Sequence, residues 1–238
     1  MIGVSQLLSV GWEKFFDPRF KRIGAGYDVA TTVGGKSNPA SIAILQECNG
    51  IYYARLSLLF KTQDPNVVFQ IFSCVARGLT TRDLRIGKLC VDATSERFFA
   101  TILKGKMRSL GIPTELVVSS ESKIFRSEKM NYKCYLGNLI CNEFADGRIA
   151  IPNVPWAKDN VRQVYRTKGT FAADVDASGN HADYFDALKL ARYALSSADS
   201  RAHVDDAKIG DGLDRNPTKA PSKNPLLKQR KKKGNLYV

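Results

Sequence analysis

The amino-acid sequence predicts an α/β protein with a mixed sheet. This sheet begins as an antiparallel three-stranded meander, continues with parallel strands and is flanked by helices. Three apolar segments open the chain, and Asn49-Gly50, the dipeptide most typical of tight hairpins, joins the second segment to the third. Beyond them helical and strand-like segments alternate, which is typical of parallel strands joined by helical crossovers.

The expected strands are short runs of apolar and β-branched residues. They cover residues 22–30, 40–45, 51–60, 88–92, 114–118 and 147–152. The expected helices combine an amphipathic pattern with a polar cap or a closing glycine. They cover residues 64–77, 96–110, 127–144 and 180–197.

Capping residues mark the boundaries of these helices. Asp64 precedes Pro65, which suits the first helical position, and Gly78 is expected to end that helix. Ser127 and Asn180 are expected to cap the third and the last helix, because their side chains can accept a hydrogen bond from a free backbone N–H.

Composition divides the chain into a lead-in over residues 1–20, a folded domain over 21–198 and a tail over 199–238. The tail contains ten Lys or Arg against five Asp and little to bury, so we expect a disordered basic segment. No apolar run is long enough for a membrane span and no signal peptide is visible, which predicts a cytosolic protein. The five cysteines include no C-x-x-C pair, which favours buried thiols over disulfides or a zinc site.

The net charge of +13 favours a protein that binds phosphates. Within this basic chain three elements present an aspartate: Asp28 on the first strand, Asp92 at the end of a later strand, and Asp183 on the last helix. Ligand sites of open α/β sheets gather near the carboxyl ends of strands, and carboxylates brought together there repel one another unless cations lie between them. The pattern predicts two Mg²⁺ or Mn²⁺ ions, which bind oxygen ligands.

Other acids near these positions have simpler explanations. Asp186 lies three residues after Asp183, so both carboxylates project from one side of the helix, where the helix dipole favours them. Asp186 nevertheless falls among apolar positions, which favours a role beside a cation. Glu96 fits a first-turn helix acid, and His181 fits a residue at a helix start.

Three motifs, taken in this order, resemble the nuclease domain of tailed-phage large terminases. They are Gly26-Tyr27-Asp28-Val29-Ala30, Cys90-Val91-Asp92-Ala93-Thr94 and His181-Ala182-Asp183-Tyr184-Phe185-Asp186-Ala187-Leu188-Lys189-Leu190-Ala191. The resemblance covers about residues 22–197 and implies a ribonuclease H-like fold. It also implies that Asp28, Asp92 and Asp183 ligate the metal ions. Asp186 and Glu96 would then be auxiliary acids, and His181 would lie beside the site.

The sequence departs from this family in three places. Asn38 stands where members often have another acid, and Ser95-Glu96-Arg97 replaces glycines that often follow the second motif. The stretch before Arg22 leaves no room for the packaging ATPase domain of a full large terminase. We therefore expect a separated nuclease domain or a truncated product.

By this resemblance the chain is expected to be a metal-dependent endonuclease, a hydrolase that cuts double-stranded phage DNA during genome packaging. Its expected partners are DNA, a packaging ATPase, a small terminase subunit and a portal, in the cytoplasm of an infected or lysogenic bacterial host. The expected DNA contacts are Lys36 and the tail residues Lys231, Lys232 and Lys233.

Two other interpretations stay open. Residues 30–37 match a relaxed P-loop pattern, in which Lys36 and Asp92 would serve nucleotide binding. That mechanism requires a helix directly after Lys36-Ser37, whereas Asn38-Pro39 and a strand-like run follow. The chain could also be a non-catalytic DNA-binding packaging module that keeps the fold.

Overall fold

The computed structural model describes residue 8 and residues 11–31, 38–125, 128–167, 170–175 and 181–210. The chain forms two units, Met1–Arg201 and Ala202–Val238. The second unit is described over residues 202–210, which are helical. The fold that follows is that of the first unit.

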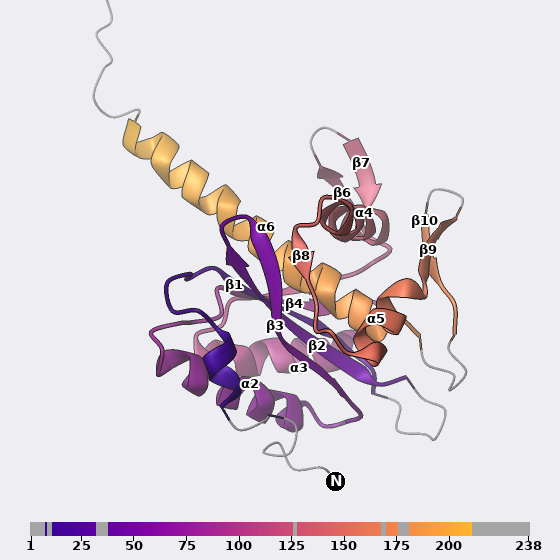
Figure 1. Cartoon of the computed structure of the whole chain (residues 1–238), viewed down its shortest axis with the longest axis horizontal. Helices are drawn as coiled ribbons and strands as arrows, with labels where there is room; N and C mark the ends of the chain where they lie inside the picture. Colours follow the sequence, from indigo (N-terminus) through magenta and orange to yellow (C-terminus); the bar gives the residue numbers. More distant parts are fainter. Residues whose placement is uncertain are drawn as a thin grey trace, which may run out of the picture. The chain divides into compact units, whose positions relative to one another are not determined.

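A six-stranded mixed sheet forms the centre of this unit (Figure 1). Its strands are β1 (Ile23–Asp28), β2 (Ala40–Cys48), β3 (Ile51–Phe60), β4 (Lys88–Asp92), β5 (Thr114–Val117) and β8 (Ile149–Ala150). The spatial order is β5-β4-β1-β2-β3-β8. Strands β1, β2 and β3 form an antiparallel meander, whereas β4 pairs parallel to β1, β5 parallel to β4 and β8 parallel to β3. The predicted mixed sheet, an antiparallel three-stranded meander continued by parallel strands, is confirmed.

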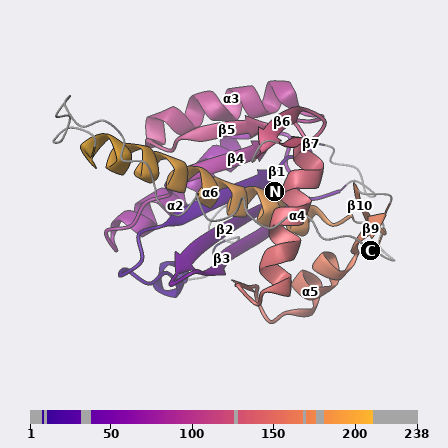
Figure 2. The same cartoon turned by 90° about the horizontal axis from the view of Figure 1, so that it is seen from above.

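Helices cover both faces of the sheet (Figures 1 and 2). The helical elements are η1 (Trp12–Phe15), α2 (Pro65–Thr80), α3 (Arg97–Met107), η2 (Arg108–Leu110), α4 (Tyr132–Ala145), α5 (Pro155–Arg162) and α6 (Asp183–Gly210). Helices α2 and α3 share one apolar core with the sheet, while α4, α5 and α6 pack on the opposite face. Two β-hairpins lie beside α4. They are β6 (Ser122–Phe125) with β7 (Glu128–Asn131), and β9 (Val164–Thr167) with β10 (Thr170–Ala173).

Strand β1 presents different residues to the two faces, because successive side chains of a strand point in opposite directions. Those in the core with α2 and α3 are Ile23, Ala25 and Tyr27. On the other face a Cβ atom at Gly26 would lie 2.1 Å from the Ala187 carbonyl oxygen, and one at Gly24 would lie 2.7 Å from that of Ala191. The two glycines therefore let the backbone of α6 lie directly on β1. Asp28 is the next residue on this face.

Two local sequence predictions are confirmed. Asn49 and Gly50 have φ angles of 52° and 80°, as a tight turn between β2 and β3 requires. Asp64 caps α2 by accepting a hydrogen bond from the Asn66 backbone N–H at 2.8 Å, and Pro65 is the first helical residue.

The prediction that Gly78 ends this helix is wrong. Helix α2 continues to Thr80, with Gly78 inside it. A Cβ atom on Gly78 would lie 2.5 Å from Cζ2 of Trp12. This glycine therefore makes room for the indole of Trp12 in η1. Its role is to allow this close packing, and the helix continues past it.

The prediction of a helix starting at residue 127 is also wrong. Helix α4 begins at Tyr132, and Asn131 caps it by accepting a hydrogen bond from the Cys134 backbone N–H at 2.8 Å. The residues before it form the β6–β7 hairpin, and Ser127 lies outside the described residues.

The last helix is longer than predicted. Helix α6 begins at Asp183 and runs to Gly210, past the expected end at residue 197. Its expected cap, Asn180, and residues 211–238 of the expected tail lie outside the described residues. Within the described part of the chain, none of the helices has the length and apolar character needed to cross a bilayer.

We expect Gly26→Ala to lower the free energy of unfolding by about 3 kcal/mol, because the new methyl group would collide with the backbone of α6. Gly105→Ala is the matched control. Gly105 lies within α3 with open space around its Cα, so alanine should raise the stability by up to about 1 kcal/mol. Urea denaturation followed by circular dichroism measures both changes. Equal effects of the two substitutions would contradict the close approach of α6 to β1.

Candidate active site

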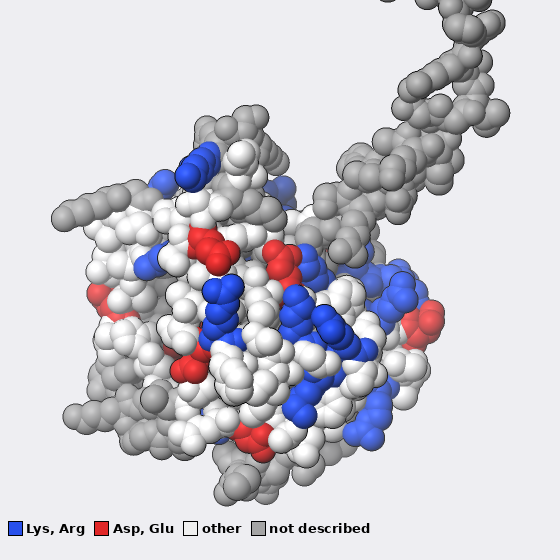
Figure 3. All heavy atoms as spheres, turned by 180° about the vertical axis from the view of Figure 1, so that it is seen from behind, with Lys and Arg blue, Asp and Glu red and all other residues white. Residues whose placement is uncertain are grey.

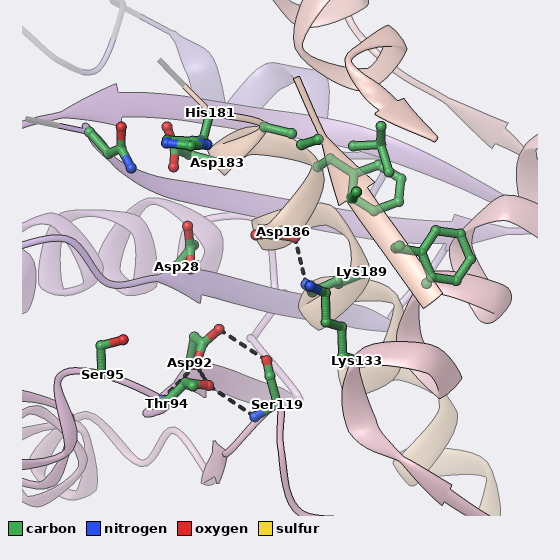
Figure 4. A pocket seen from close by; sticks show the side chains of 18 of the residues that line it. Asp28, Asp92, Thr94, Ser95, Ser119, Lys133, His181, Asp183, Asp186 and Lys189 are labelled. Atoms are coloured by element: carbon green, nitrogen blue, oxygen red, sulfur yellow. Dashed lines mark hydrogen bonds and ion pairs between the residues drawn. The ribbon is translucent and has the colours of Figure 1, made fainter. Parts of the chain in front are cut away.

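An open pocket of about 690 Å³ lies where β1 and β4 end and α6 begins (Figure 4). Four of its lining residues are acidic: Asp28, Asp92, Asp183 and Asp186. Its other polar lining residues are two lysines, one histidine, two asparagines and several hydroxyl side chains: Lys133, Lys189, His181, Asn38, Asn131, Thr94, Ser95, Ser119 and Ser120. The predicted acids of the three motifs therefore face one common space.

Strand pairing places the first two aspartates. Tyr27 lies opposite Val91 in the parallel pairing of β1 with β4, and an aspartate follows each of them. Asp28 and Asp92 are thus the final residues of two neighbouring parallel strands, at the edge of the sheet where ligand sites of α/β proteins form. Each points to the face on which α6 packs.

Helix α6 brings the other two aspartates. Asp183 and Asp186 lie in its first turn, and only 6% of the surface of Asp183 is exposed. Since the helix lies directly on Gly24 and Gly26 of β1, its first turn comes to rest beside the end of that strand.

Asn160 of α5 fixes the start of α6, and it is not among the site residues that the sequence predicts. Its side-chain oxygen accepts hydrogen bonds from the backbone N–H groups of Tyr184 and Phe185, at 3.0 and 3.1 Å. Its amide nitrogen donates to the His181 carbonyl oxygen at 3.1 Å. A cap is usually sought next to its own helix, whereas this one comes from an earlier helix, so no local pattern indicates it.

Hydrogen bonds orient the Asp92 carboxylate. Its Oδ1 accepts from the backbone N–H and the hydroxyl of Thr94, at 2.8 and 2.5 Å. Its Oδ2 accepts from the Ser119 hydroxyl at 3.5 Å, and the Ser119 backbone N–H donates to the Thr94 hydroxyl oxygen. The loops after β4 and β5 therefore hold this carboxylate in one orientation.

The pocket is strongly negative around Asp28. Burial, followed by the negative charges of Asp186, Asp92 and Asp183, raises the pKa of Asp28 well above its ordinary value of 3.8, and Lys189 opposes this shift. Burial alone would lower the pKa of Lys189. The carboxylates of Asp186, Asp28 and Asp92 outweigh that effect and raise it, so Lys189 stays positively charged.

The chemistry of these groups suits a hard divalent cation. Carboxylate and hydroxyl oxygens are the ligands that Mg²⁺ and Mn²⁺ prefer, and a cation would relieve the repulsion that raises the pKa of Asp28. In the present arrangement, however, no group of three or more His, Cys, Asp or Glu among the described residues is placed to hold a metal ion.

Not every predicted site residue lies in the pocket. Asp28, Asp92, Asp183, Asp186 and His181 line it. Glu96 does not; its carboxylate accepts a hydrogen bond from the Thr31 hydroxyl at 2.7 Å. Asn38, which stands in place of an acid common in the family, does line it. The predicted DNA contacts, Lys36, Lys231, Lys232 and Lys233, lie outside the described residues.

The structure opposes the P-loop interpretation. Lys36 itself lies outside the described residues, but the chain that follows forms β2 from Ala40 onward, paired antiparallel to β1. A phosphate-binding loop needs a helix N-terminus at that place. A strand cannot supply it, so the structure disfavours nucleotide binding by this segment.

Solved structures similar to this chain include terminases. No family model matches the chain, and no curated protein does. The large terminase of a thermophilic bacteriophage is 10% identical with a TM-score of 0.49, over 78% of this chain and 44% of that one. The human cytomegalovirus terminase nuclease domain is 10% identical with a TM-score of 0.49, over 79% of this chain and 94% of that one. A Mn-soaked structure of the same domain is 11% identical with a TM-score of 0.43, over 81% of this chain and 89% of that one.

The chain thus corresponds to less than half of the phage large terminase and to nearly all of the cytomegalovirus domain. At sequence identities of 10–11%, the similarity is one of fold.

We expect Asn160→Ala to lower the free energy of unfolding by about 1–3 kcal/mol, because it removes three hydrogen bonds and leaves the buried start of α6 without partners. Asn142→Ala, at an exposed position of α4, should change it by less than about 0.5 kcal/mol. Chemical denaturation measures both. A neutral effect of Asn160→Ala would show that the start of α6 is held by other contacts.

The raised pKa of Asp28 predicts a pH-dependent stability. Because the folded protein binds this proton more tightly than the unfolded chain, the free energy of unfolding should fall as the pH rises from about 4 through the folded pKa. In EDTA at neutral pH, Asp28→Asn should therefore be more stable than the unmodified protein. At pH values below about 4 the difference should vanish. Thermal denaturation across this range tests it, with exposed Asp159→Asn as the control.

Proposed function

We propose that this chain is a metal-dependent endonuclease that hydrolyses the phosphodiester bonds of double-stranded DNA, in the terminase-type cutting of phage DNA during genome packaging. The observation that supports the proposal most is the pocket itself. It gathers Asp28, Asp92 and Asp183 from two strand ends and one helix of a ribonuclease H-like sheet.

In this proposal Asp28, Asp92 and Asp183 would hold the metal ions, Mg²⁺ or Mn²⁺ and two in number. When bound, such ions activate a water molecule and stabilise the charge that develops on the phosphate. The chain contributes rigid carboxylates. Thr94 and Ser119 fix the orientation of Asp92, and Asp183 is held by the docking of α6 on β1.

Three further pocket residues have proposed roles around these carboxylates. Asp186 is the auxiliary acid and is paired with Lys189 at 2.5 Å. His181 is exposed and lines the pocket beside Asp183 (Figure 4). Glu96, the second predicted auxiliary acid, lies outside the pocket lining, so we give it no part in the chemistry.

Basic surface would hold the DNA. Lys and Arg side chains gather on one side of the face shown in Figure 3, with few Asp or Glu between them. The chain as a whole carries a net charge of +13. Since duplex DNA carries one negative charge per about 1.7 Å, such a surface gives affinity without reading the sequence.

The biological setting follows from the same resemblance. We propose a packaging ATPase, a small terminase subunit and a portal as partners, and the cytoplasm of an infected or lysogenic bacterial host as the place of action. The phage large terminase extends well beyond the part that this chain matches.

A non-catalytic DNA-binding packaging module is the second candidate. The observation in its favour is that no three acids of the described chain are placed to hold a metal ion as they stand. Such a module would bind DNA with a steep dependence on salt and would leave it intact with any divalent ion.

Plasmid cleavage distinguishes the two candidates. With Mg²⁺ or Mn²⁺ the purified chain should nick and linearise supercoiled plasmid, and EDTA should abolish this. Asp28→Asn, Asp92→Asn and Asp183→Asn should each lower the rate by at least about 100-fold, because each removes a charged oxygen ligand. Asp159→Asn, on the exposed surface of α5, should cut at the normal rate. DNA binding without cleavage by a folded protein would favour the binding module instead.

A further inference from the structure

We propose that Lys189 is a built-in cation of the acid pocket, which weakens the binding of divalent metal while no DNA is present. Its ammonium group supplies positive charge to the same carboxylates that a metal ion would bridge. The inference rests on the proposed function, since it concerns the regulation of the same site.

The first observation is the burial of Lys189. Its side chain is only 7% exposed, and its Nζ lies 2.5 Å from Oδ1 of Asp186, whose side chain is 39% exposed. Lysine is almost never buried to this extent unless it is paired. The ammonium therefore lies on the inner side of α6, facing the pocket, while solvent reaches the acid more readily than the base (Figure 4).

The second observation is that the charge of Lys189 acts on more than its direct partner. It interacts electrostatically with Asp28 at the end of β1 and with Asp92 at the end of β4, as well as with Asp186 on its own helix. An ion pair that only stabilised a helix surface would join two neighbouring side chains of that helix. This lysine instead interacts with acids of three separate elements, β1, β4 and α6.

The charges of the pocket explain why a metal ion would compete with Lys189. Four carboxylates, from Asp28, Asp92, Asp183 and Asp186, line the pocket, and Lys189 is the buried cation among them. The other two groups that can carry positive charge, Lys133 of α4 and His181, are exposed. A divalent ion entering this space meets the repulsion of a nearby ammonium that cannot withdraw into solvent without leaving Asp186.

DNA would shift this balance. A phosphate group adds negative charge to the pocket and can itself coordinate the metal, so binding of DNA and binding of metal should reinforce each other. In the free protein Lys189 would keep metal affinity low. The pocket would then fill with metal mainly when its substrate is present.

Metal affinity in the absence of DNA tests the proposal. Lys189→Met keeps an unbranched apolar stem and removes the charge. An opposite charge within about 4–6 Å changes the proton affinity of a carboxylate by about 10- to 1,000-fold, so we expect Lys189→Met to bind Mn²⁺ at least about tenfold more tightly. Isothermal titration with MnCl₂ at constant pH measures this. An unchanged or weaker affinity would overturn the proposal.

Two matched variants separate charge from shape. Lys189→Arg keeps the charge and should bind Mn²⁺ like the unmodified protein. Lys133→Met removes an exposed lysine of the same pocket and should leave the affinity within about twofold. Lys189→Gln can still donate a hydrogen bond to Asp186 and gives the same answer if the methionine variant does not fold. An equal gain in Lys133→Met would show that net charge, and not the place of Lys189, sets the affinity.

The experiment also separates this inference from the proposed function. Metal-dependent plasmid cleavage by the unmodified chain, with equal Mn²⁺ affinities for it and Lys189→Met, would leave the nuclease standing and overturn the role of Lys189. Absence of cleavage together with absence of Mn²⁺ binding by every variant would overturn both. Mn²⁺ binding by Lys189→Met where the unmodified chain binds none would be the clearest support.

Discussion

The architecture of this protein depends on one close contact between two backbones. Because Gly24 and Gly26 lack side chains, α6 lies directly on β1, with no room even for a methyl group between them. The contact fixes the height and the direction of the helix over the sheet. Asp28 continues the glycine face of β1, so the same contact sets its place beside the first turn of α6. A side chain at either glycine would move the helix and the acids of its first turn together.

The pocket built on this contact concentrates like charges in a way that ordinary packing would avoid. Burial and the neighbouring carboxylates disfavour the ionised form of Asp28, which lies at the end of β1. Groups with strongly shifted pKa values cluster at functional sites for this reason. Lys189 and the hydrogen bonds to Asp92 relieve part of the conflict, and a bound cation would relieve more. The proposed metal binding and the proposed role of Lys189 therefore both follow from the repulsion among the carboxylates of this pocket.

Much of the fold follows from local sequence patterns, and most of what the patterns missed depends on contacts between distant residues. Asn49-Gly50 defined the meander, and the aspartates at strand ends indicated which acids would meet; their role as metal ligands stays a prediction. Gly78 looked like a helix end because its partner, Trp12, lies far away in the chain. Strand β7 is short and has little apolar patterning, so the predicted helix begins before it, at residue 127. Asn160 was missed because the backbone groups that it caps belong to another helix.

The placement of α6 at the far end of the domain also has a consequence for how the protein is made. The contact of β1 with α6 joins the first strand of the sheet to the last helix that the structure describes, so it closes a very long loop of chain. Such distant pairings form late, whereas the meander and the helices after it can assemble from nearby residues. During synthesis, Asp28 and Asp92 leave the ribosome well before Asp183. The acid pocket is therefore absent from the growing chain and arises only when the finished domain docks its final helix.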